Sequence, residues 1–244
     1  MSTEADVQHV VDIRRVKTTK EKFIRDRKQV VQNVHPDLFN ELKIGSYSNK
    51  RILDIMLGSL ALVGFIIAYP LIALGIKISS TGPVLFRQPR TGKAGQKFEC
   101  LKFRTMHVVN KTNGDGTPVV TQKGDSRIFA FGQFLRKTNL DELPQILNVI
   151  KGEMSLVGPR PYPVEECAYW NQKFDDHYYR YILKPGITGF AQAQGYRGGT
   201  LDEELMRKRL DFDLIYVEKS SFTFDLRIIY KTVKRMIGRD TNGH

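Results

Sequence analysis

The longest apolar segment of the chain covers residues 52–76 and is interrupted by Asp54, Ser59, Tyr69 and several small residues. A continuous helix of this length, at about 1.5 Å per residue, exceeds the roughly 30 Å of hydrocarbon in a bilayer. The segment therefore predicts insertion into a membrane. Pro70 lies well inside it, and because proline removes a helical hydrogen bond, it predicts a break or kink near this residue.

The charges that flank this segment are positive on both sides. They are Lys50 and Arg51 before it, and Lys77, Arg87 and Arg90 after it. Positive residues mark the cytoplasmic end of a membrane helix, so symmetric flanks assign no orientation to a spanning helix. Two arrangements stay open at this point: a hairpin broken at Pro70 with both ends in the cytoplasm, and a kinked single span.

A second apolar pattern lies near the C-terminus and has helical spacing. Its apolar face comprises Leu226, Ile229, Tyr230, Val233, Met236 and Ile237, and its basic residues are Arg227, Lys231, Lys234 and Arg235. Such an amphipathic helix is typical of a surface helix packed on a core. Beside a membrane segment, a helix lying in the membrane interface is the competing interpretation.

Between these segments, short strands and helices without regular alternation predict an α+β domain. Residues 84–86 and 98–103 have the pattern of strands joined by a hairpin at residues 90–95, and helical structure is expected from residue 129. Residues 110–124 are rich in Gly, Asn, Asp and Thr and predict a mobile loop. Residues 184–189 predict a turn, and two helices follow.

The chain is accordingly divided into three parts. Residues 1–49 are expected to be a polar extension, residues 50–78 the membrane segment, and residues 79–244 a cytosolic domain that ends in the amphipathic helix. The polar N-terminus carries no secretory signal pattern. Cys100 and Cys167 lie far apart in the sequence, which favours two reduced core thiols over a disulfide or a zinc site.

The net charge of +12 and the pI of about 9.7 predict an anionic partner. Nucleic acid, anionic lipid and phosphorylated small molecules all satisfy this requirement. The Gly-rich phosphate-binding motifs of dinucleotide-binding folds and P-loop proteins are absent from the sequence. The net charge therefore predicts an anionic partner but does not show which kind of molecule it is.

The chemistry is concentrated in residues 136–145, where Asp141 and Glu142 follow a basic pair and precede Pro144. Proline is tolerated early in a helix, so Pro144 predicts a helix that starts between Asn139 and Asp141. The start of a helix favours negative charge, and such a position suits a phosphate, a carboxylate nucleophile or a metal. The alternative is a structural helix with acidic residues in its first turn.

Several basic residues are candidates for binding phosphate. Arg160 lies between two prolines, and a rigidly held guanidinium suits bidentate phosphate binding, although a bridge to a surface carboxylate is the simpler interpretation. Lys102 and Arg104 alternate along a strand, so both are expected on one face. His107 and His177 have no suitably spaced partner ligands, and neither is assigned to a metal.

Taken together, these motifs resemble those of the bacterial sugar transferase family, the monotopic polyprenol-phosphate phosphoglycosyl transferases. The resemblance extends from Lys50 to about Ile237, and many short motifs occur in the family's order. They are Lys-Arg-Ile-Leu-Asp at 50–54, Thr-Gly-Pro-Val at 81–84, Phe-Arg-Gln-Pro-Arg-Thr-Gly at 86–92, Lys-Phe-Arg-Thr-Met at 102–106, the segments at 134–145 and 151–161, and Lys-Pro-Gly-Ile-Thr-Gly-Phe-Ala-Gln at 184–192.

The resemblance implies transfer of a sugar 1-phosphate from a UDP-sugar to an undecaprenyl-type polyprenol phosphate, with release of UMP. Asp141 would be the nucleophile that forms a covalent phosphosugar intermediate, and Asp141 and Glu142 would hold Mg²⁺. Arg136 and Arg160 would bind phosphate oxygens. Further expected substrate contacts are Lys102, Arg104, Gln192 and Arg197.

The resemblance also implies a monotopic protein on the cytoplasmic face of the bacterial inner membrane, with a re-entrant helix broken at Pro70. Tyr69 departs from the small residue that the family often has before this proline, and Asn139 replaces a common Ser while keeping a capping side chain. The segment 195–200 resembles that of relatives that transfer glucose or galactose 1-phosphate. The implied role is the first membrane step of exopolysaccharide, capsule or O-antigen synthesis.

The expected partners are the UDP-sugar, polyprenol phosphate and membrane lipid, with no nucleic acid; the oligomeric state is open, a homodimer included. Two other functions compete with transfer. A membrane-bound basic scaffold would explain the charge but not the ordered carboxylate and arginine motifs. A hydrolase would pass the phosphosugar to water, and product analysis with and without polyprenol phosphate separates it from a transferase.

Overall fold

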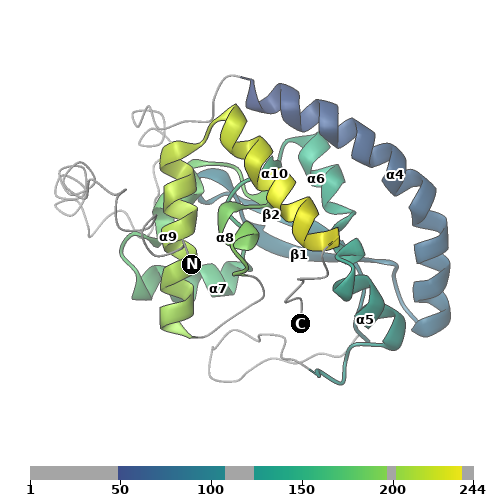
Figure 1. The fold of residues 1–244 in the computed structure, drawn as a ribbon. Helices are drawn as coiled ribbons and strands as arrows, with labels where there is room; N and C mark the ends of the chain where they lie inside the picture. Colours follow the sequence, from purple (N-terminus) through teal and green to yellow (C-terminus); the bar gives the residue numbers. More distant parts are fainter. Residues whose placement is uncertain (1–48, 108–123, 197–201, 238–244) are drawn as a thin grey trace. The chain divides into compact units, whose positions relative to one another are not determined.

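The apolar segment forms one long helix, α4 (Lys50–Ser79), of 30 residues. The computed structural model describes residues 49–107, 124–196 and 202–237, and all of them belong to one unit that covers Leu42–His244. The helix continues through Pro70 without interruption, so the expected break is not seen. Figure 1 instead shows α4 bending along its course, which is an expected effect of a proline inside a helix.

One face of α4 packs on the rest of the protein, and the opposite face is apolar and exposed. Phe65, Ile72 and Ile76 are buried, and a Cβ on Gly58 would lie 3.2 Å from Ile150, which shows how closely α6 approaches. The exposed face carries Ile52, Ile55, Met56, Leu60, Val63, Ile66, Ile67, Leu71, Leu74 and Ile78. The helix is long and apolar enough to cross a membrane, and only 17% of its most apolar stretch is buried.

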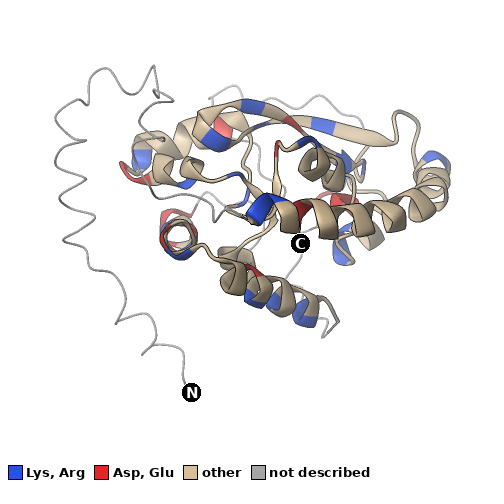
Figure 2. Cartoon of the chain, turned by 90° about the horizontal axis from the view of Figure 1, so that it is seen from above, with Lys and Arg blue, Asp and Glu red and all other residues tan. Residues whose placement is uncertain are grey.

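The distribution of charge separates the ends of α4 from its middle. Figure 2 shows charged residues gathered at the start of the helix and almost none along the rest of its length. Lys50 and Asp54, at this start, are buried, and both bind other parts of the chain. The charged groups at the start of α4 thus make contacts within the protein, while the exposed face of the helix consists mainly of apolar side chains.

The predicted hairpin is present. Strand β1 (Leu85–Thr91) pairs in antiparallel fashion with β2 (Lys97–Phe103), and the short 3₁₀ turn η1 (Lys93–Gly95) connects them. The first strand is longer than the predicted residues 84–86 because its pairing continues through Pro89 to Thr91. This hairpin places Lys102, near the end of β2, beside the chain segment that follows α5.

Three short elements lead from the hairpin to the second sheet. Helix α5 (Ala130–Lys137) confirms the predicted helical segment, and the 3₁₀ turn η2 (Leu140–Glu142) and helix α6 (Gln145–Lys151) follow it. Strand β3 (Ser155–Val157) then pairs in parallel with β4 (Gly186–Thr188). The predicted turn at residues 184–189 therefore contains a strand, which exists because β3 supplies its hydrogen-bond partner.

The remaining elements are helical. They are α7 (Val164–Lys173), the 3₁₀ helix η3 (His177–Ile182), α8 (Phe190–Ala193), α9 (Glu203–Lys219) and α10 (Phe222–Ile237). The described residues thus form a mixed fold that is mostly helical. Cys100 and Cys167 are both free and buried, as predicted.

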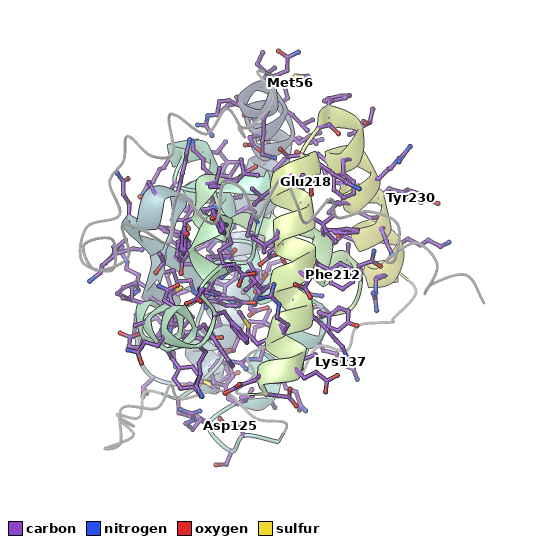
Figure 3. All side chains as sticks on the ribbon, turned by 90° about the vertical axis from the view of Figure 1, so that its left-hand side faces the viewer. Met56, Asp125, Lys137, Phe212, Glu218 and Tyr230 are labelled. Carbon is purple, nitrogen blue, oxygen red and sulfur yellow. The ribbon has the colours of Figure 1, made fainter. Side chains whose placement is uncertain are left out.

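The two C-terminal helices confirm the prediction for this region. In α10, Leu226, Tyr230, Val233 and Met236 are exposed apolar or aromatic residues, while Ile228 is buried. Figure 3 shows Met56 of α4 and Tyr230 of α10 pointing away from the body of the protein. Helices α4 and α10 therefore both have apolar side chains on their exposed surfaces.

Candidate active site

Asp141 and Glu142 lie in a tight turn between two helices. Asn139, just before η2, has a left-handed backbone with φ 58° and ψ 15°, which asparagine tolerates better than most residues. The predicted helix start between Asn139 and Asp141 is wrong, because α6 begins at Gln145 after a 3₁₀ turn. The side chain of Asn139 does not cap the turn, contrary to expectation.

The carboxylate of Glu142 is held by two cations. Its Oε1 accepts hydrogen bonds from Lys102 Nζ at 2.7 Å and from Arg160 at 3.0 Å. Burial by itself would raise the pKa of Glu142, but the charges of Arg160 and Lys102 outweigh it and hold the pKa well below its usual range. Glu142 is therefore ionised and fixed in position by β2 on one side and by the 159–161 turn on the other.

The carboxylate of the neighbouring Asp141 has a different environment. Within the part of the chain that the structure describes, its carboxylate has no hydrogen-bond or ion-pair partner. Burial raises the pKa of Asp141 to about 6; the charge of Glu142 adds to the rise, and Lys102, Arg136 and Arg160 oppose it. Asp141 is thus mostly ionised at neutral pH and has no partner among the described residues, which suits a carboxylate nucleophile.

Arg136 approaches this site from the last turn of α5. Its Nε donates to Thr105 Oγ1 at 2.8 Å, and its two terminal nitrogens make no hydrogen bond to any described residue. Thr105, which is 6% exposed, was not singled out in the sequence as a site residue. Its position directly after Arg104 in the Lys-Phe-Arg-Thr-Met motif is a signal by which the sequence could have identified it.

The contact between Thr105 and Arg136 leads to a first prediction. Thr105→Val keeps the shape of the side chain but removes the acceptor for Arg136 Nε, so the guanidinium loses its fixed orientation. We expect kcat/KM to fall about tenfold and the free energy of unfolding by about 1 kcal/mol, since one hydrogen bond is lost. Steady-state kinetics and denaturant unfolding measure both quantities, and an unchanged kcat/KM would contradict the role of Thr105.

The turn that carries Arg160 is rigid. Pro159 and Pro161 flank the arginine, and a Cβ on Gly158 would lie 2.3 Å from the carbonyl oxygen of Lys184, so only glycine fits there. The carbonyl of Pro159 accepts from the N–H of Gly186 at 3.0 Å. This packing against β4 fixes the backbone from which Arg160 reaches Glu142, as the two prolines predict.

Three other predicted site residues lie elsewhere or outside the described part. Arg104 is buried and donates to Ser80 Oγ and to the carbonyls of Pro83 and Ser80, so it secures the end of α4, and its expected phosphate contact is not supported. Gln192 is buried in α8 and donates to the carbonyl of Ile187. Arg197 and most of the predicted mobile loop at 110–124 lie outside the described residues.

The carboxylate oxygens of Asp141 and Glu142 indicate which metal ion the site would suit. Among the described residues, no group of three or more His, Cys, Asp or Glu side chains forms a metal site. Lys102 and Arg160 both bind Oε1 of Glu142, so Oε2 has no hydrogen bond to a described residue. Mg²⁺ typically takes only one or two protein carboxylates and completes its shell with water and substrate phosphates, so the donors present fit this ion.

Comparison with known proteins shows which family the chain resembles. Residues 45–239 match the family described as bacterial sugar transferase. A "UDP-glucose:undecaprenyl-phosphate glucose-1-phosphate transferase" of Xanthomonas campestris pv. campestris is 43% identical over 79% of the chain. A protein of the same name from Caulobacter vibrioides is 43% identical over 78% of the chain. "Exopolysaccharide production protein PSS" of Rhizobium leguminosarum bv. phaseoli is 40% identical over 75%.

These relatives differ in length. The aligned part is 39% of the Xanthomonas protein, 70% of the Caulobacter protein and 92% of the Rhizobium protein. The residues matched to the family, 45–239, contain α4, the carboxylate pair and the arginines described above. The chain belongs to the bacterial sugar transferase family.

Proposed function

We propose that the protein transfers a sugar 1-phosphate from a UDP-sugar to a polyprenol phosphate through a covalent intermediate on Asp141. The observation that carries this proposal is the contrast between two adjacent carboxylates. Glu142 is bound by Lys102 and Arg160, whereas Asp141 is unpaired among the described residues although four charged groups surround it. A basic scaffold would give no reason for this contrast.

The reaction consists of two displacements at one phosphorus atom. An oxygen of Asp141 attacks the phosphorus that bears the sugar, the bond from that phosphorus to the bridging oxygen breaks, and UMP leaves. A phosphate oxygen of the polyprenol phosphate then attacks the same phosphorus, and the bond to Asp141 breaks. The carboxylate is regenerated, and the product is a polyprenol diphosphate sugar.

The surrounding cations have distinct tasks in this scheme. The terminal nitrogens of Arg136 make no hydrogen bond to a described residue and can bind phosphate oxygens, and Thr105 orients the side chain. Arg160 and Lys102 fix Glu142, and with Asp141 this carboxylate would hold Mg²⁺. When bound, Mg²⁺ would neutralise phosphate charge and polarise the bond that breaks. Because the site is partly buried, each of these charges acts more strongly than it would in water.

The sugar is proposed to be glucose or galactose. The names of the Xanthomonas and Caulobacter relatives, which specify UDP-glucose, support glucose. The name of the Rhizobium relative supports a role in exopolysaccharide production, with capsule and O-antigen synthesis as related settings.

We further propose that α4 enters and leaves the cytoplasmic leaflet of the inner membrane on the same side. At its start, Lys50 binds Asp225 at 2.5 Å; at its end, Ser80 binds Arg104 at 2.6 Å. A helix that crossed the bilayer would place its ends about 30 Å apart on opposite sides. Attachment of both ends to one domain therefore supports a monotopic arrangement, with the exposed faces of α4 and α10 in lipid.

This arrangement gives a second prediction. Cysteine introduced at Asn49 or at Lys77, which flank the apolar stretch, is expected to be protected from a membrane-impermeant maleimide in intact spheroplasts. After permeabilisation, both positions are expected to be labelled. Cys100 and Cys167 are buried and give little background labelling. Labelling of only one of the two positions in intact spheroplasts would indicate a spanning helix instead.

The function itself is tested by product analysis, which is our third prediction. Protein in nanodiscs with UDP-glucose, Mg²⁺ and polyprenol phosphate should release UMP and form a polyprenol diphosphate sugar in equal amounts. Without polyprenol phosphate, UMP release should stop after about one equivalent per protein, because the intermediate cannot be discharged. Continued release of UMP with free sugar phosphate would indicate a hydrolase, and no release with any UDP-sugar would favour a scaffold.

A further inference from the structure

We propose that two buried arginines, Arg180 and Arg90, are positioning residues for the reaction. They hold the backbone around Arg160 so that its guanidinium meets Glu142. Arg180 is 2% exposed and Arg90 is 8% exposed, so neither side chain is part of the protein surface. This inference rests on the proposed function, because it concerns how the candidate active site is assembled.

The carbonyl oxygens of the 159–162 turn are all held by distant parts of the chain. The first and the last accept hydrogen bonds from backbone amides. The carbonyl of Pro159 accepts from the N–H of Gly186 at 3.0 Å, and the carbonyl of Tyr162 accepts from the N–H of Thr91 at 3.2 Å. The two middle carbonyls accept from arginine side chains instead, so here particular side chains fix the course of the backbone.

Arg180, from η3, holds the carbonyl of Arg160 itself. Its Nη2 donates to this oxygen at 2.6 Å and to the carboxylate of Asp213 at 2.7 Å. Its guanidinium also lies over the ring of Tyr162, 4.2 Å from the ring centre. Three contacts therefore fix this side chain, and one of them is to the main chain of the residue whose side chain binds Glu142.

Arg90, from β1, holds the next carbonyl of the turn. Its Nη1 donates to the carbonyl oxygen of Pro161, and its Nη2 donates to Oε1 of Gln88 at 2.9 Å on the same strand. Two separate elements, η3 and β1, thus fix consecutive peptide groups. From this backbone Arg160 donates to Oε1 of Glu142 at 3.0 Å.

The burial of both arginines indicates a task beyond stability. Removing a guanidinium from water is unfavourable, and a buried ion pair can often be replaced by apolar side chains without loss of stability. The Nε of each arginine is also buried without a hydrogen-bond partner among the described residues. A task in the site explains this arrangement, because a displacement of about 1 Å in an active-site group can lower a rate by about 100-fold.

The competing interpretation is that these arginines only stabilise the fold, with the Arg180–Asp213 pair joining η3 to α9. The chain contains a matched control for this possibility. Arg207 of α9 binds Asp176, the residue just before η3, at 2.8 Å, so it joins the same part of the chain to α9. A purely structural role predicts similar effects for the two arginines, and positioning of Arg160 predicts different ones.

The experiment measures kcat, and KM for UDP-glucose, using the full chain in nanodiscs with Mg²⁺ and polyprenol phosphate. In Arg180→Lys the charge stays, but the nitrogen lies one bond short of the Nη2 that it replaces, so the bond to the carbonyl of Arg160 is lost. We expect kcat to fall about tenfold and KM to change less than about twofold, because the donor still binds while the group that fixes Glu142 is displaced. Arg207→Lys should leave both constants unchanged.

A second background shows whether Arg180 acts through Arg160. Arg160→Gln already removes the guanidinium at Glu142, so adding Arg180→Lys to it should lower kcat by less than about twofold further. If the same tenfold loss, about the full effect, appeared in both backgrounds, Arg180 would act independently of Arg160. That result would overturn the inference, and so would equal losses in Arg180→Lys and Arg207→Lys.

Arg90→Lys is the second variant, and it keeps the inference testable if the first does not fold. It loses the bond to the carbonyl of Pro161, so it should show the same pattern, a fall in kcat of about tenfold that is absent in the Arg160→Gln background. Arg87→Lys is its control, because Arg87 lies on the same strand in an exposed ion pair. Thermal unfolding checks that each variant is folded. An unchanged kcat in either variant would overturn the inference for that arginine.

Hydrogen–deuterium exchange separates a failure of this inference from a failure of the proposed function. The amides of Gly186 and Thr91 donate to the outer carbonyls of the same turn. Loosening of the turn should therefore raise their exchange rates about fivefold or more in Arg180→Lys and Arg90→Lys, and not in the two controls. If the wild-type protein shows no turnover with any UDP-sugar, the proposed function fails, while faster exchange would still support the hold on the turn. Unchanged exchange would overturn the inference whether or not the protein turns over.

Discussion

Asp141→Asn is expected to abolish the covalent hexose-phosphate adduct and to lower turnover by about three orders of magnitude or more. The substitution keeps the size of the side chain and removes its nucleophilic charge. Because Asp141 makes no hydrogen bond or ion pair with the described residues, its replacement disrupts no contact there. The fold should therefore be preserved, with the free energy of unfolding unchanged or slightly raised, since a buried unpaired charge is removed.

The measurement is the intact mass of the protein after incubation with UDP-glucose and Mg²⁺ but without polyprenol phosphate, combined with rapid quenching. The wild-type protein should gain the mass of one hexose phosphate, and the variant should not. Asp211→Asn is the matched control, because Asp211 lies on α9 in an exposed pair with Arg207. An adduct of undiminished yield on the Asp141 variant would exclude this residue as the nucleophile.

This experiment also tests the scaffold alternative. A basic scaffold binds anionic partners through its net charge of +12, and loss of one carboxylate makes that charge more positive. Binding to anionic vesicles should then be unchanged or slightly stronger in the variant. Loss of turnover with retained vesicle binding would show that the function depends on the active site. If neither turnover nor vesicle binding changed in the variant, the function would depend on the surface charge instead.

The sequence predicts the residues at the centre of the site because their chemistry is local. Asp141 and Glu142 are adjacent, and Arg160 lies between two prolines that fix its turn, so short motifs describe them well. Lys102 was found by its place on a strand, and the β1–β2 hairpin brings it to Glu142 across 40 residues of sequence. The adjacent carboxylates and the turn of Arg160 are thus described by short motifs, whereas the approach of Lys102 and Arg160 to Glu142 is set by the fold.

Contacts that depend on the choice among distant partners could not be predicted from the sequence. Arg104 is a basic residue of the same motif as Lys102, but its guanidinium donates hydrogen bonds to Ser80 and Pro83. Strand β4 forms only because β3 pairs with it, and Thr105 matters only because Arg136 approaches it. In each case the deciding contact joins segments whose relative position is set by the packing of the whole domain.

Glu142→Gln should have a large effect on both activity and stability. The carboxylate of Glu142 is 15% exposed and is the shared partner of Lys102 and Arg160. Its neutralisation leaves two partly buried cations without a counter-charge, which should cost about 3 kcal/mol of unfolding free energy. Turnover should fall about 100-fold or more, because a proposed Mg²⁺ ligand is lost and Arg160 is no longer held in place.

The two effects are separable by a second substitution. Adding Lys102→Met to Glu142→Gln removes one of the two orphaned cations, so part of the lost stability should return while turnover stays low. Denaturant unfolding and steady-state kinetics measure the two quantities in parallel. Glu99→Gln is the control, because Glu99 pairs with Arg87 on the same hairpin while both are more than 60% exposed, and it should change stability by less than about 0.5 kcal/mol.

If stability and turnover both recovered in the double variant, the only role of Glu142 would be to neutralise Lys102. Another residue would then have to hold the proposed Mg²⁺. If stability recovered alone, the carboxylate would have a task in the reaction that its ion pairs do not explain. The contrast with Asp141 favours the second result. One carboxylate is fixed by cations, and the other, beside it, has no partner among the described residues, which is the arrangement expected when the first organises the site and the second reacts.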